Sequence, residues 1–177
     1  MDFESNIKED LHKYLVSQTR IDEHLPECPD LEEWWPTVAR AYLPDGLREF
    51  KDYPVTSLGW IMFVGMALAK YWDVDWEKFS KEGGAVVYAS LRDARGFDNL
   101  DDYVLQDVLG VDEREGEEIM KVVAECAQRT YAAIMKSGLE PGTQEAMKLY
   151  VAALHQLYLM GIGMELNALG YHMTQLQ

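Results

Sequence analysis

The residues from Tyr53 to Ala69 form a run of 17 without a charged side chain. On a helical wheel its apolar residues cover every side, so a helix made from this run has no face that favours water. Pro54, Thr56 and Ser57 leave the strictly apolar part shorter than the roughly 20 residues that cross a bilayer. The run therefore predicts a buried helix over about residues 55–72 rather than a membrane span.

The C-terminal part of the chain also predicts a helix that must be buried. From Leu149 to Gln177 the only formally charged side chain is Glu165, although the whole chain has 16 basic and 31 acidic residues. We expect a last helix over about residues 143–169 that also needs burial on most sides. Two such helices in one chain predict a central pair covered by other elements.

The rest of the chain has the periodicity of amphipathic helices that could cover this pair. Apolar residues recur at steps of three and four over residues 3–25, up to Pro26, which should stop the helix. A second helix should open with Asp30 as its cap, bend at Pro36 and end at 43–46. Further helices are expected over residues 86–94, 98–110 and 112–136, the last opened by the capping pair Asp112 and Glu115.

Together these segments predict an all-α fold. We expect residues 1–177 to form a single domain, an irregular helical bundle in which the two apolar helices are wrapped by amphipathic ones. A regular four-helix bundle is less consistent with the sequence, because the predicted helices differ widely in length. The N-terminus has no basic stretch followed by an apolar one, so we expect a cytoplasmic protein without a secretory signal.

Composition excludes several classes of function. The net charge of −15 leaves no surplus of basic side chains to replace phosphate counterions, so direct nucleic-acid binding is not expected. Two cysteines rule out a disulfide framework and a four-cysteine zinc site. Glu9 and His12 have a metal-binding spacing, but the known di-metal bundles use two such pairs and two further glutamates. We therefore expect no metal and no cofactor.

Acidic residues are concentrated between Asp98 and Glu118, where Arg114 is the only basic residue. Several of them fall at expected helix starts, where the helix dipole favours negative charge, and a solvated surface would explain the run. The functional interpretation is a surface that attracts a basic protein partner. Its candidate residues are Asp98, Asp101, Asp102, Asp112, Glu113 and Glu115.

Glu165 falls on the apolar stripe of the last helix, on the same side as Tyr158. A carboxylate there must be paired, protonated or exposed at the end of the stripe. We expect Glu165 to be largely buried and bonded to a cation or to several hydrogen-bond donors, with Lys70, Arg92 and Arg95 as candidate cations. The functional alternative is a ligand site that uses Glu165, Tyr158 and His155.

No motif of a nameable reaction is present, so the sequence favours a non-enzymatic protein–protein interaction module. It could act by self-association, for which five tryptophans offer anchors, or as an inhibitor or immunity-like protein against a basic partner. The alternative is a small-molecule-binding protein or enzyme with a pocket between the central helices, using Glu165.

Overall fold

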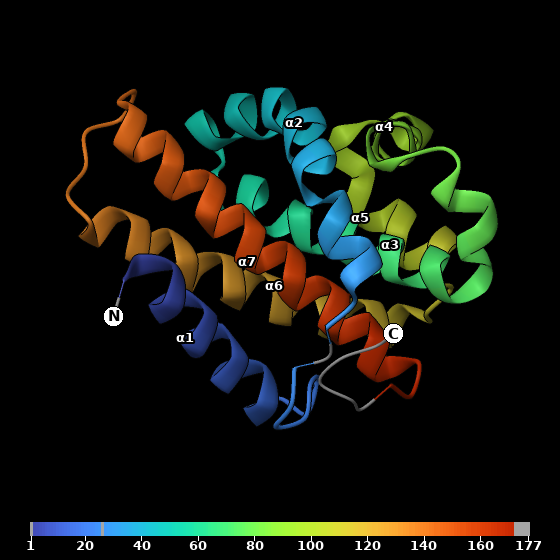
Figure 1. The fold of residues 1–177 in the computed structure, drawn as a ribbon. Helices are drawn as coiled ribbons and strands as arrows, with labels where there is room; N and C mark the ends of the chain where they lie inside the picture. The colour runs from blue at the N-terminus through green and yellow to red at the C-terminus, as the bar shows by residue number, and fades with distance from the viewer. Residues whose placement is uncertain (1, 26, 172–177) are drawn as a thin grey trace.

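The computed structural model describes residues 2–25 and 27–171, and these form an α-helical bundle without a β-strand (Figure 1). The all-α prediction is confirmed. The main helices are α1 (Phe3–Ser17), α2 (Pro29–Asp52), α3 (Pro54–Ser80), α4 (Gly84–Arg95), α6 (Glu113–Lys136) and α7 (Gln144–Ala168). Between α4 and α6 the chain forms the short turns η1 (Phe97–Asn99), α5 (Leu100–Tyr103) and η2 (Val104–Val108), of which η2 is π-helical.

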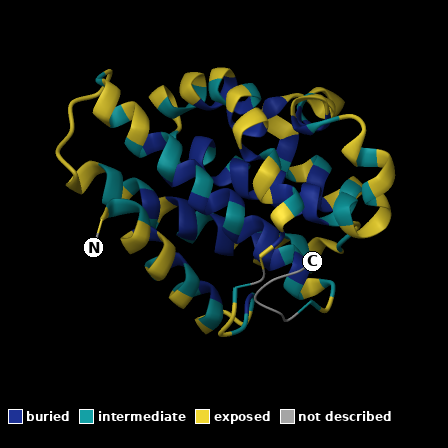
Figure 2. Ribbon diagram, viewed as in Figure 1, coloured by how far each residue is buried: buried dark blue, intermediate teal, exposed yellow. Residues whose placement is uncertain are grey.

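Helices α3 and α7 form the buried centre of the bundle, as the sequence predicts (Figure 2). Their backbones touch: a Cβ placed on Gly65 would lie 2.5 Å from the Tyr158 carbonyl oxygen, and one on Gly161 would overlap the Met62 carbonyl. Glycine at both positions permits this approach, which leaves no space for a pocket at the crossing. No helix of the described residues combines the length and apolar character needed to cross a membrane.

The first two helices differ from the prediction at their ends. Helix α1 stops at Ser17 rather than near Pro26, because Thr19 adopts a left-handed conformation with φ of 57°. Helix α2 begins at Pro29, after Cys28 as its cap residue, and Asp30 instead accepts a hydrogen bond from the Trp72 indole.

Helix α2 also does not end at 43–46, because it continues through Pro44 to Asp52. Pro44 has no N–H and so removes one hydrogen bond from the helix. The helix continues because neighbouring groups hold this part of it in place. The Ser57 hydroxyl donates to the Gly46 carbonyl oxygen, and the Tyr42 hydroxyl donates to the Ser57 carbonyl oxygen.

The later helices follow the prediction more closely. Helix α4 includes the predicted helix 86–94, and the Asp112 and Thr143 side chains cap α6 and α7. Helix α3 continues past Trp72 to Ser80, with a break at Asp75. The predicted helix 98–110 is instead divided among η1, α5 and η2.

Candidate functional site

A sharp reversal of the chain places η2 against the start of α6. The Leu109 N–H donates to the Val104 carbonyl oxygen at 2.8 Å, closing a wide π-type turn. Gly110 then takes a φ of 65°, which a residue with a side chain rarely adopts. Asp112 caps α6 by accepting from the Glu115 N–H at 2.8 Å. A π-helical turn is uncommon and is often found at functional sites.

These elements enclose a groove of about 610 Å³, which we call the acidic groove. Its apolar lining consists of Leu105, Val111 and Met120, which are buried or half-buried. Its charged lining consists of exposed side chains, which are Asp102, Asp112, Glu113, Glu117 and Lys121. The groove therefore combines an apolar base with four carboxylates and one ammonium group.

None of these four carboxylates has an ion pair in the described part of the chain. The Asp112 carboxylate accepts the capping hydrogen bond from the Glu115 N–H, whereas those of Asp102, Glu113 and Glu117 have no such partner there. The Lys121 ammonium lies 3.6 Å from Glu118, outside the groove lining. The negative charge of Asp102, Glu113 and Glu117 is thus exposed to solvent rather than balanced by a neighbouring side chain.

The acidic surface predicted from the sequence is only partly assembled here. Asp102, Asp112 and Glu113 line the groove, whereas Asp98 lines a different cavity beside Arg48. Asp101 is half-buried, and this burial raises the pKa of its carboxyl. Glu115 accepts two hydrogen bonds of 3.0 Å from the Arg20 guanidinium.

The second set of predicted site residues does not converge on one point. Tyr158 is fully buried and donates to the Leu31 carbonyl oxygen at 2.7 Å. His155 stacks on Trp35, with Nδ1 3.5 Å from Glu4 and Nε2 3.3 Å from Glu32. Glu165 is ten residues further along α7 than His155, which corresponds to about 15 Å of helix. A ligand site that includes Glu165 remains a prediction.

Glu165 is half-buried, and its carboxylate has no hydrogen bond or ion pair among the described residues. Burial and the charge of Asp73 raise the pKa of its carboxyl to about 7, while the Lys70 ammonium opposes this shift. Among the described residues, the carboxylate therefore has neither the bonded cation nor the hydrogen-bond donors that we expected. Arg92 and Arg95 are paired elsewhere, with Asp45 and Asp107.

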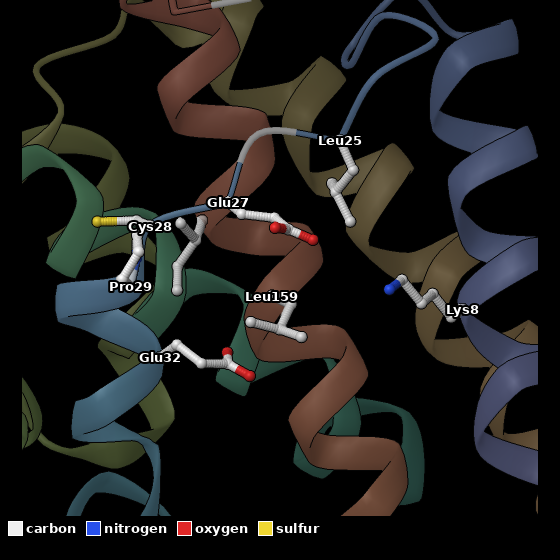
Figure 3. Close-up of a pocket in the computed structure, with 8 residues that line it drawn as sticks. Lys8, Leu25, Glu27, Cys28, Pro29, Glu32 and Leu159 are labelled. Atoms are coloured by element: carbon white, nitrogen blue, oxygen red, sulfur yellow. The ribbon is translucent and has the colours of Figure 1, made fainter. Parts of the chain in front are cut away.

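A cavity of about 260 Å³ lies beside α7, on the side of α1 and α2 rather than α3 (Figure 3). The Lys8 amine and the Glu32 carboxylate lie on opposite sides of it. Cys28 is also part of its lining, and burial raises the pKa of this thiol to about 11. The thiol is therefore protonated at neutral pH, which argues against a role as nucleophile.

One buried polar cluster was not anticipated from the sequence. The Asp45 carboxylate, 8% exposed, accepts from the Tyr88 hydroxyl at 2.7 Å and pairs with Arg48 at 3.0 Å and Arg92 at 3.3 Å. Asp45 stands between Pro44 and Gly46, a sequence typical of a turn, so no local signal indicates its burial. Because its partners come from α2 and α4, the cluster joins these two helices.

Metal binding finds no support among the described residues, since no three His, Cys, Asp or Glu side chains group around one point. Glu9 instead pairs with Lys13, and the His12 ring contacts the Asp22 carbonyl oxygen.

Comparison of the chain with protein-family models, curated proteins and solved structures yields no match.

Proposed function

We propose that this protein is a non-enzymatic interaction module that binds a basic partner protein through the acidic groove. The observation that carries the proposal is the arrangement of Asp102, Glu113 and Glu117, three exposed and unpaired carboxylates beside an apolar base. Such a surface attracts positive charge, and its apolar part can then bury a hydrophobic side chain.

The two parts of the groove have different roles in this proposal. Exposed ion pairs contribute little affinity each, about 0.2–1 kcal/mol, but they speed and orient the encounter of two proteins. Burial of apolar surface on Leu105, Val111 and Met120 supplies the larger share of the binding free energy. The form of this function that we favour is an inhibitor or immunity-like protein that covers a basic surface of its partner.

Binding of a defined peptide tests the proposal. The probe is a fluorescently labelled amphipathic peptide of lysine and leucine, and its affinity is measured by fluorescence anisotropy. The test variant replaces Asp102 by Asn and both Glu113 and Glu117 by Gln. The control variant carries Glu33→Gln, Glu77→Gln and Glu82→Gln, which make the same change in net charge at exposed positions outside the groove.

We expect the groove variant to bind the peptide about tenfold more weakly than the wild type, since three lost pairs of about 0.5 kcal/mol each amount to that factor. The control variant should lose much less. Binding by the wild type should also weaken as salt rises from about 0.05 M to about 0.5 M. Equal weakening in both variants would show attraction by net charge alone and would contradict a role for the groove.

A further inference from the structure

The opposite end of α6 has a second hollow, of about 270 Å³, which we call the apolar groove. It is enclosed by the C-terminal half of α2, the end of α6, the loop 137–143 and the start of α7. None of its lining residues is charged, although 27% of the chain is charged. Its chemistry is therefore unlike that of the acidic groove.

Large apolar side chains are exposed around this groove. Seven such side chains are exposed in the described part of the chain, and four of them, Leu47, Met135, Leu139 and Met147, line the groove. Of these four side chains Met135 is the most exposed, at 59%. A concentration of exposed apolar groups at one place marks an interaction surface more often than scattered ones do.

The base of the apolar groove is held firmly in position. The Phe50 ring packs edge-on against the rings of Tyr150 and Tyr131, at centroid distances of 5.1 and 6.0 Å. The Tyr150 hydroxyl hydrogen-bonds to the Ser57 hydroxyl at 2.5 Å. The hollow is thus formed before any partner binds, which reduces the entropy cost of binding.

Charge indicates which partner this face can accept. Residues 134–149 contain two lysines and two glutamates, Lys136, Glu140, Glu145 and Lys148, and are neutral in sum. The chain as a whole has a net charge of −15, so most approaches of two copies are opposed by repulsion. At this face two copies can meet without that local repulsion, and each lysine can face a glutamate of the other copy.

We propose that the apolar groove binds a second copy of this chain in a twofold dimer. In such an interface the same surface patch of each copy must fit the other. This face can meet that requirement, because the exposed side chains of Met135 and Leu139 line the hollow that the partner's corresponding side chains can enter. The flexible side chains of Met135 and Met147 can adjust to such a contact.

The dimer is independent of the proposed function of the acidic groove. Glu117 and Met135 are 18 residues apart on α6, which corresponds to about 27 Å. Both grooves can therefore be occupied at once, and a dimer would present two acidic grooves.

The test measures mass by light scattering and sedimentation over the micromolar range for the wild-type chain and two variants. The groove variant is Met135→Glu with Leu139→Glu. The control is Val74→Glu with Val86→Glu, which makes the same charge change at exposed apolar positions outside the groove. Circular dichroism checks that both variants keep the helical fold.

We expect a wild-type dimer, a dimeric control and a monomeric groove variant. Dimer formation should strengthen as salt screens the repulsion between copies, whereas peptide binding at the acidic groove should weaken. These opposite responses separate a failure of the dimer proposal from a failure of the proposed function. A monomeric wild-type chain, or a groove variant that remains dimeric, would overturn the dimer. So would a monomer whose apolar groove binds a small apolar dye.

Discussion

Among the charged residues of the described structure, Asp45 is the one whose side chain is buried, and its carboxylate accepts hydrogen bonds from three donors. Asp45→Asn should reduce the free energy of unfolding by about 2–4 kcal/mol, since the charges of Arg48 and Arg92 lose their buried partner. The matched control is Asp93→Asn, whose carboxylate also pairs with Arg92 but is 68% exposed. Urea unfolding should show a change within about 0.5 kcal/mol for the control, and equal losses in both variants would contradict this role.

Glu165 makes the stability depend on pH in the opposite way from a paired carboxylate. Its pKa of about 7 in the folded chain lies above the usual value near 4.3, so the folded state holds a proton that the unfolded state releases. Its ionisation therefore reduces stability as pH rises from about 5 to about 8.

Glu165→Gln removes this ionisation and should be more stable than the wild type at pH 8. The advantage should widen by about 2 kcal/mol between about pH 5 and about pH 8. Urea unfolding at both pH values measures it, with the exposed Glu82→Gln as a control for charge alone. A Glu165→Gln variant less stable than the wild type at pH 8 would reveal a favourable ion pair instead.

At the scale of helices, the contact of α3 with α7 depends on Gly161 and Gly65. Gly161→Ala should destabilise the fold by about 3 kcal/mol, because the new methyl group would push against the Met62 backbone. Gly116→Ala in α6 is the control, since its Cβ would meet side chains at 3.8 Å and alanine favours a helix. Thermal melts should separate the two variants, and a Gly161→Ala variant as stable as the wild type would disprove the close packing.

The central helices could be predicted because a helix that is apolar on all sides must be buried in the protein when it is too short to cross a bilayer. The continuation of α2 through Pro44 could not, because it depends on Ser57 of α3 and on Tyr88 and Arg92 of α4. No residue near Pro44 in the sequence carries that information. The local signal of the Asp112 cap was correct, whereas the Asp30 cap and the helix end at 43–46 were wrong. Contacts between distant segments decide those two positions, and the sequence does not show them.

The residues of the acidic groove also divide into those that the sequence could indicate and those that it could not. Asp102, Asp112 and Glu113, which belong to the run of carboxylates in the sequence, line one groove. The pairing of Glu115 with Arg20 joins residues 95 positions apart, which no local pattern reveals. The apolar base formed by Leu105, Val111 and Met120 depends on the π-helical turn η2, for which the sequence gave us no indication.

The whole molecule separates two kinds of surface along one helix. The start of α6 has unpaired negative charge, and its end has an uncharged apolar hollow. The five tryptophans that suggested anchors for self-association are used within the chain instead, where each is buried or partly buried against the core. We therefore propose that self-association takes place through the apolar groove rather than through the tryptophans.

We propose above that a basic partner binds at the acidic groove. Amide chemical shifts of the ¹⁵N-labelled chain, recorded during titration with the lysine–leucine peptide, test it most directly. We expect the largest shifts at Leu105, Val111 and Met120, while Met135 and Met147 stay unchanged. Shifts centred on Met135 and Met147, or spread evenly over the acidic surface, would contradict it.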